Sequence, residues 1–342
     1  MYARLGTTIV GTAIVAAFSL GAWAQERVTL KISSFTPPPH WTNSQLFQPW
    51  AKELEKKSGG KVRATLFAGN SAFGKIENQT DQVKAGATDL AWVMNGVPRG
   101  RFLRSLIMDL PFMAPDAHAA TKTMWAMLPT HLKEDYAGFK VLAITCHNAG
   151  DFFFRDRKVE RMEDLKNLRI RAPSSQVQAL LQHVGAVPVT MGPGQIYEGL
   201  EKGTLDGLLS VYDGVRGFRL ESLVKYALSA RVYVTCFNIT MNQAKYDGLP
   251  PDAKKLIDET TGERWIEAMP ALWDKNDDAG RKLALSKGLQ VVEVSEEQRN
   301  KWRDHARPVI DQQLADLEKQ GISNAREIHA EMLKQVARFS KK

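Results

Sequence analysis

One arginine stands out as a residue able to do chemistry in this 342-residue sequence. Arg171 ends a short strand-like stretch between the apolar Ile170 and the stiff pair Ala172-Pro173. That pattern predicts a guanidinium at the carboxyl end of a parallel strand, where ligands of α/β sheets gather. A guanidinium keeps its proton and matches a carboxylate with two parallel hydrogen bonds. Arg171 therefore predicts an organic-anion site, although from the residues alone an ion pair with a protein carboxylate is the commoner role.

The sequence lacks the familiar motifs of catalysis and cofactor binding. In Gly192-Pro193-Gly194 the third glycine of a dinucleotide fingerprint is displaced and a proline sits inside the turn. The patterns G-x-S-x-G, H-E-x-x-H, C-x-x-C and G-x-x-x-x-G-K-[ST] do not occur, and the seven histidines form no i, i+4 pair typical of a metal site. A serine hydrolase stays formally open, because its triad is spatial rather than sequential. We predict no cofactor and no metal.

Composition and charge are those of a globular protein with a core. Hydrophobic residues make up 44% and charged residues 25% of the chain, and its length predicts about two domains because one core stops growing near roughly 250 to 300 residues. The net charge of +8 is scattered rather than gathered on one element, which argues against a nucleic-acid partner. Cys146 and Cys236 flank two expected crossovers, so a bridge is conceivable, but we expect free buried thiols.

The N-terminus has the pattern of a secretory signal. Residues 1–24 contain one cation, Arg4, then an apolar run and Ala22-Trp23-Ala24 before the polar Gln25. The run is too short and too interrupted for a membrane span of about 20 residues, and A-x-A is typical of a cleavage site. We therefore expect cleavage after Ala24 and export, which for a bacterial signal of this kind means the periplasm.

Strand-like and helix-like segments alternate along the rest of the chain. Residues 28–33 and 90–94 have strand patterns, and residues 43–58 and 76–85 have helical ones. Alternation of this kind specifies a parallel, doubly wound sheet. A second such unit follows residue 147, and the β-branched run 231–241 crosses back.

We thus expect two α/β lobes joined by at least two extended crossovers. Residues 252–288 are helical in pattern and contain Pro270, which should kink the helix. A helix of that length could brace both lobes.

From residue 35 to about 260 the chain resembles the substrate-binding proteins of TRAP transporters, the tripartite ATP-independent periplasmic systems (the DctP-like family). The resemblance depends on the order of several motifs rather than on one. They are Trp50-Ala-Lys-Glu-Leu54, Ser58-Gly-Gly-Lys61, Lys84-Ala-Gly-Ala-Thr-Asp89, Gly100-Arg-Phe102, Leu110-Pro-Phe112, Met162-Glu-Asp-Leu-Lys-Asn-Leu-Arg-Ile-Arg-Ala-Pro173, Gly185-Ala186, Pro188, Tyr197, Gly203-Thr-Leu-Asp-Gly207, Met241-Asn242 and Leu249-Pro250.

The resemblance implies a periplasmic-binding-protein-like α/β fold of two doubly wound lobes, with a hinge and a long lobe-spanning helix. We expect lobe I to comprise residues 25–147 and 236–275, and lobe II residues 148–235 and 276–342. Arg171 matches the family's carboxylate-binding arginine. Sialic-acid-binding members carry Glu-Asn-Pro where this chain has Leu209-Ser210-Val211, and their second arginine would fall near Asp151. A smaller or more apolar carboxylate is therefore expected.

The resemblance also points to residues that line a cleft beside Arg171. Cleft walls are mostly apolar with few orienting polar groups, and the aromatic residues at strand ends suit an aromatic or branched acid. Asp213 has three open roles: pairing with Arg171, accepting a ligand hydroxyl, or facing solvent. The expected lining residues are Phe35, Trp92, Asn95, His147, Asn148, Ser210, Tyr212, Asp213, Phe237 and Asn238, each of which also suits an ordinary core position.

The function that these features favour is capture rather than catalysis. We expect a non-enzymatic periplasmic protein that binds an organic acid and closes by hinge motion. Arg171 favours a monocarboxylate as that acid. The resemblance implies delivery to a TRAP-type membrane permease driven by an ion gradient. Two alternatives stay open: a secreted hydrolase or lyase with His147 or Asp213 as its base, and the binding component of an ABC importer or a sensor.

Overall fold

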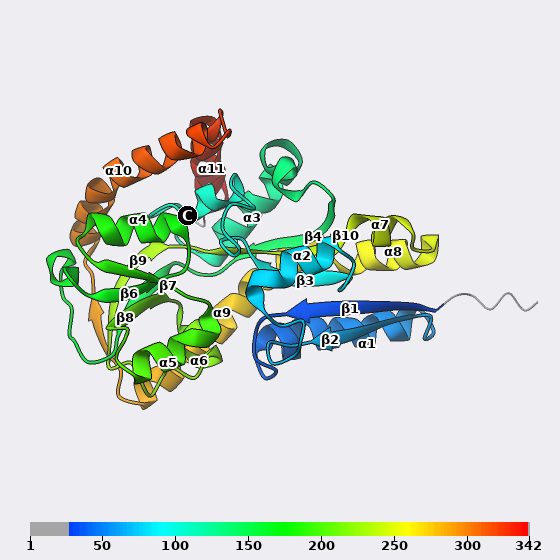
Figure 1. Ribbon diagram of the computed structural model, residues 1–342, viewed down its shortest axis with the longest axis horizontal. Coiled ribbons are helices and arrows are strands. Elements are labelled where there is room, and N and C mark those ends of the chain that lie inside the picture. The colour runs from blue at the N-terminus through cyan, green and yellow to red at the C-terminus, as the bar shows by residue number, and fades with distance from the viewer. Residues whose placement is uncertain (1–26, 341–342) are drawn as a thin grey trace, which may run out of the picture.

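The computed structural model describes residues 27–340, which form two β-sheets with helices on their faces (Figure 1). The first sheet has the order β2-β1-β3-β10-β4 and the second the order β11-β9-β5-β8-β6-β7. We call these sheets with their helices lobe I and lobe II. The expected signal peptide 1–24 and its cleavage after Ala24 lie outside the described residues. Within residues 27–340, no helix combines the length and apolarity needed to cross a membrane.

Lobe I consists of the five-stranded sheet and the helices that pack on it. β1, β2 and β3 are parallel, whereas β10 pairs antiparallel with both β3 and β4. The strands are β1 (Val28–Ser34), β2 (Val62–Phe67), β3 (Leu90–Met94), β4 (Phe139–Cys146) and β10 (Cys236–Asn242). The helices are α1 (Gln48–Lys57), preceded by a π-helical turn (Thr42–Phe47), α2 (Gln79–Lys84), α3 (Ala117–Met127), α7 (Gln243–Asp247) and α8 (Pro251–Thr260).

Lobe II repeats this mixed arrangement. β6 is parallel to β7 and β8, and β9 is parallel to β11, but β5 is antiparallel to β8 and β9. The strands are β5 (Gly150–Phe154), β6 (Arg169–Ala172), β7 (Val187–Thr190), β8 (Gly207–Ser210), β9 (Tyr226–Tyr233) and β11 (Gln290–Glu293). The helices are α4 (Ser175–His183), α5 (Ile196–Glu201) and α6 (Tyr212–Gly217).

The two α/β lobes are confirmed. The expectation of wholly parallel sheets is wrong, because β5 and β10 run antiparallel to their neighbours. Each of these strands is entered directly from the other lobe, after residues 147–149 or 234–235. A parallel connection needs a crossover of about a dozen residues or more, usually a helix. These short links leave no room for one, so both strands enter their sheets in the opposite direction.

A disulfide joins Cys146 to Cys236, so the expectation of free thiols is wrong. The two cysteines are opposite each other in the antiparallel register of β4 and β10, with their Cα atoms 4.0 Å apart. They are 90 residues apart in sequence, and only the pairing of these two strands brings them together. The bridge ties the two crossovers at the edge of lobe I.

The long helix expected over residues 252–288 is two helices, α8 and α9 (Glu263–Ser286). The break is at Gly262, whose φ of +57° lies in the left-handed region and whose amide donates to the carbonyl of Leu142. Pro270, where a kink was expected, lies inside α9. α9 still spans about 36 Å, and it packs against α6 in lobe II and against α3 and β4 in lobe I (Figure 1). The lobe-spanning helix is therefore confirmed.

The C-terminal helices cross from one lobe to the other. In the first half of α10 (Glu296–Lys319), Trp302 and Ala306 pack in the core of lobe II. In its second half, Leu314 and Leu317 pack in the core of lobe I. α11 (Ala325–Phe339) packs against α3 in lobe I. The expected boundaries assigned residues 276–342 to lobe II, and we propose instead that α11 belongs to lobe I.

Candidate functional site

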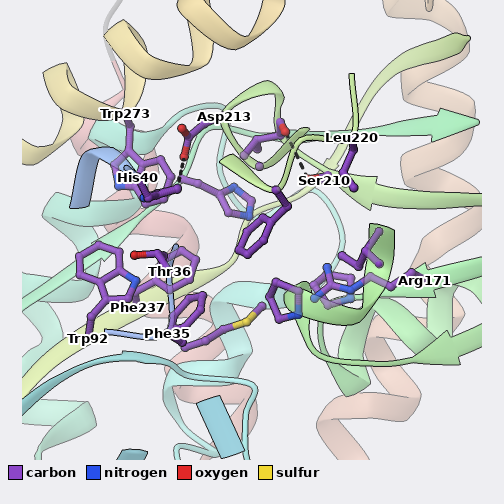
Figure 2. Close-up of a pocket in the computed structure, with 18 of the residues that line it drawn as sticks. Phe35, Thr36, His40, Trp92, Arg171, Ser210, Asp213, Leu220, Phe237 and Trp273 are labelled. Carbon is purple, nitrogen blue, oxygen red and sulfur yellow. Dashed lines mark hydrogen bonds and ion pairs between the residues drawn. The ribbon is translucent and has the colours of Figure 1, made fainter. Parts of the chain in front are cut away.

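A pocket lies between the two lobes, at the ends of β3 and β10 in lobe I and of β6 and β8 in lobe II (Figure 2). It gathers seven of the eleven residues expected from the sequence: Phe35, Trp92, His147, Arg171, Ser210, Asp213 and Phe237. It also includes residues that the sequence did not single out, namely Thr36, His40, Met94, Pro173, Pro193, Ile196, Val211, Gly214, Phe218, Leu220, Tyr233 and Trp273.

Four expected residues do not line this pocket. Asn95 accepts a hydrogen bond from Asn238 at 2.8 Å, and both are fully buried. Asn148 accepts from the backbone amide of Ala117 at the start of α3, and Tyr212 packs edge-on against Phe153. Neighbours on an extended chain point to opposite faces. Phe237 thus faces the pocket while Asn238 faces away from it, so only the first of these two neighbours can meet a ligand.

Aromatic rings form one wall of the pocket. Trp92 and Phe237 are stacked with ring centroids 5.2 Å apart, and Phe237 and Trp273 are stacked at 5.6 Å. Phe35 is also close to parallel with Phe237. A flat ligand ring could continue such a stack. Trp273 comes from α9, where helical spacing with Trp265, Ile266 and Met269 indicates burial but not which pocket it faces.

Arg171 is a buried cation without a carboxylate partner in residues 27–340. Its side chain makes only long hydrogen bonds to backbone carbonyls, from Nε to Met191 at 3.4 Å and from Nη1 to Leu209 at 3.5 Å. The nearby Asp206 pairs instead with Arg169, at 2.6 Å. Burial lowers the pKa of Arg171 to about 10, so it stays charged at neutral pH. An anion entering the pocket would compensate this charge.

Tyr233 stands beside Arg171 and adds a second donor. Burial raises the pKa of the Tyr233 phenol above its usual range, so the hydroxyl keeps its proton. Within residues 27–340 that hydroxyl makes no hydrogen bond. Arg171 and Tyr233 thus both bring donors to the pocket. The sequence indicated only a strand here, because nothing in the run from Arg231 to Met241 shows which residue meets Arg171.

His147 is held in one neutral form by the backbone. Its Nδ1 donates to the carbonyl of Asn148, and its Nε2 accepts from the amide of Thr235 at 3.1 Å. Burial lowers the pKa of His147 to about 4. Because both ring nitrogens are engaged, His147 presents only its ring to the pocket and is not available as the base that a hydrolase or lyase would need.

We expect the protein to be more stable near pH 5 than near pH 7.5. Burial raises the pKa of Asp109, Asp151 and Asp277 from 3.8 to about 7. Between these values the folded protein holds protons that the unfolded chain has released, so the free energy of unfolding falls as pH rises from about 4 to 7. The lowered pKa values of His147 and His329 act oppositely below about 6.5, but these are two groups against three. Denaturant unfolding across this pH range measures the balance.

Asp109→Asn isolates one of the three groups. Asp109 is fully buried, accepts from the Thr235 hydroxyl at 3.1 Å, and has no partner for Oδ1. The amide resembles the protonated acid, so stabilisation should reach roughly 2 kcal/mol at pH 8 and be small at pH 5. Equal effects at both pH values would contradict the assignment.

The sequence profile of bacterial extracellular solute-binding proteins, family 7 (DctP), matches residues 32–316. Among curated proteins, a solute-binding protein of Albidiferax ferrireducens is 27% identical over 271 residues, which cover 77% of this chain and 78% of the relative. These matches extend over both lobes and therefore include the pocket between them.

Solved structures agree closely in fold. A marine-metagenome TRAP solute-binding protein from an unidentified microbe, specific for aromatic acid ligands and bound to 3-hydroxybenzoate, is 27% identical with a TM-score of 0.86. The match covers 92% of this chain and 100% of that one. A TRAP solute-binding protein from Rhodoferax ferrireducens, in complex with copurified benzoate, is 28% identical with a TM-score of 0.86, covering 91% and 98% of the two chains.

Proposed function

Since this chain belongs to bacterial extracellular solute-binding protein family 7, the substrate-binding proteins of TRAP transporters, we propose that it captures an aromatic monocarboxylate for a TRAP-type membrane permease. It is a carrier and not an enzyme, as are the proteins to which it is similar. The observation that carries the ligand class is the unpaired guanidinium of Arg171 at the end of an aromatic-walled pocket.

Each part of the pocket has a separate task in this proposal. Arg171 and Tyr233 donate to the carboxylate, which supplies the charge that Arg171 lacks. The rings of Trp92, Phe237 and Trp273 take up the apolar body of the ligand. The two relatives at 27% and 28% identity that bind 3-hydroxybenzoate and benzoate support an aromatic acid here.

Capture and release follow from the two-lobe arrangement. Arg171 and Ser210 come from lobe II, whereas Phe35, Trp92 and Phe237 come from lobe I. A ligand that touches both sets stabilises the closed arrangement over the open one. Opening requires bending at the two short crossovers, residues 147–149 and 234–235, and movement where α9 and α10 pass between the lobes. The permease would receive the ligand when the lobes separate, and an ion gradient would drive its uptake.

The proposed compartment is the periplasm. The family is extracellular, and the expected signal at residues 1–24 with cleavage after Ala24 accounts for export. The disulfide between Cys146 and Cys236 supports the same location, because disulfides persist in oxidising compartments such as the bacterial periplasm.

Benzoate is expected to stabilise the purified protein, and its neutral analogue benzamide is not. At 100 times its dissociation constant a ligand adds about 2.7 kcal/mol to the free energy of unfolding. Benzamide has nearly the same shape but leaves Arg171 without a counter-ion. Thermal unfolding with each compound, followed by calorimetric titration, measures the difference. Equal shifts with benzoate and benzamide, or none with any aromatic acid, would overturn the proposed ligand class.

A further inference from the structure

The pocket has a second polar end, and we propose that Asp213 there accepts a hydrogen bond from a hydroxyl on the ligand ring. This inference rests on the proposed function and narrows it to ring-hydroxylated aromatic monocarboxylates. It also predicts that aromatic dicarboxylates are rejected. The argument depends on the partners of Asp213, on those of His40, and on the position of both relative to Arg171.

Asp213 is a buried carboxylate with one oxygen satisfied and one not. It is 4% exposed and lines the pocket. Its Oδ2 accepts from Trp41 Nε1 at 2.8 Å and lies 3.4 Å from His40 Nε2. Its Oδ1 has no partner within residues 27–340. This oxygen is not fully enclosed, and Asp213 lines the pocket, so a donor brought by the ligand could reach Oδ1 and take the place of water there.

His40 cannot supply that donor, because its ring nitrogens are committed. The backbone amide of Thr42 donates to His40 Nδ1 at 3.3 Å, which leaves the Nε2 proton directed at Asp213 Oδ2. The ring is also fixed by packing against α6. A Cβ on Gly217 would lie only 2.6 Å from His40 Cδ2. The pair therefore presents a preorganised acceptor, Asp213 Oδ1, and no mobile donor of its own.

The acceptor and Arg171 occupy different sides of the pocket. Figure 2 shows Arg171 at one side and the pair of His40 and Asp213 at the other, with Trp92, Phe35 and Phe237 of the aromatic wall below His40. A ligand whose carboxylate meets Arg171 would direct the remote part of its ring toward Asp213. A ring hydroxyl would then donate a charge-assisted hydrogen bond. A second carboxylate would instead meet a like charge in a buried place.

Binding of the hydroxyl is also coupled to closure. Asp213 lies in the first turn of α6 in lobe II, whereas Trp41 and His40 precede α1 in lobe I. Trp41 and His40 both contact Oδ2 of Asp213. The ligand hydroxyl would bind Oδ1 of the same carboxylate. Replacing Asp213 removes this contact between the lobes, so it should lower the affinity for every ligand by a common factor. Ligands with a ring hydroxyl should lose further affinity, because they also lose their acceptor.

Calorimetric titration of five compounds against three proteins separates these effects. The compounds are benzoate, 3-hydroxybenzoate, 4-hydroxybenzoate, 3-methoxybenzoate and isophthalate. The proteins are the wild type, Asp213→Asn, and the control Asp109→Asn, which changes another buried carboxyl group outside the pocket. We expect at least one hydroxybenzoate to bind the wild type about tenfold or more tightly than benzoate. Methoxybenzoate should not share this advantage, and isophthalate should bind worst.

In Asp213→Asn the higher affinity of the hydroxybenzoates over benzoate should largely disappear, and the affinity for isophthalate should rise relative to that for benzoate. Asp109→Asn should keep the wild-type order of affinities. These ratios are unaffected by a common loss of affinity, so a purely structural role of Asp213 would leave them unchanged. If benzoate binds the wild type as tightly as both hydroxybenzoates, this inference fails while the proposed function stands. If no monocarboxylate binds, both fail. The wild-type series decides the matter even if the variant does not fold.

Discussion

Replacing Arg171 by alanine is expected to weaken the binding of benzoate by about 30-fold to several thousand-fold, equivalent to about 2 to 5 kcal/mol. The size follows from burial. Arg171 is 5% exposed, and in residues 27–340 no carboxylate pairs with it. In the closed pocket, truncation would leave the ligand carboxylate desolvated and opposite an apolar side chain. Calorimetric titration of wild type and variant measures the ratio.

Two further variants make this result specific. Arg169→Ala removes a neighbouring guanidinium that is exposed and already paired with Asp206, and it should leave affinity nearly unchanged. Arg171→Lys keeps the charge but loses the planar fork and should recover only part of the binding. The unliganded Arg171→Ala protein should be at least as stable as the wild type, since an uncompensated buried charge is gone. An unchanged dissociation constant in Arg171→Ala would remove the basis of the proposed ligand class.

Gly280→Ala is expected to destabilise the protein by about 1 to 3 kcal/mol or more, despite the better helix propensity of alanine. Gly280 lies inside α9 where the helix crosses α6. A Cβ at this position would lie 2.2 Å from the carbonyl oxygen of Tyr212 and 3.0 Å from the amide of Asp213. Both are backbone atoms, so one helix must move. Denaturant unfolding measures the loss of stability.

The same substitution should also weaken ligand binding, because the displaced segment carries Asp213 into the pocket. Gly194→Ala is the matched control: Gly194 is exposed, and a Cβ there meets nothing within 4 Å. If Gly280→Ala were as stable and as tight-binding as Gly194→Ala, the close approach of α9 and α6 would not be a constraint on the site.

Local signals along the chain predicted most of the elements. The hydroxyl of Ser174, for example, accepts from the amide of Val177 at the start of α4, as serine before a helix typically does. The strand that ends in Arg-Ile-Arg-Ala is β6. The break at Gly262 was missed, because the pattern of apolar residues continues across it and only the hydrogen bond to Leu142 in β4 reveals it. Periodicity reports burial of a side chain, not the continuity of a helix axis.

The sequence by itself determined the two α/β lobes, the candidate arginine and the apolar character of its surroundings, because these depend on residue type and short-range spacing. It did not determine the pairing of Cys146 with Cys236, the position of Tyr233 beside Arg171, or the contact of His40 and Trp41 with Asp213. Each of these joins residues far apart in the chain. Which of them meet depends on strand register and on how the lobes pack, and neither is encoded within any one segment.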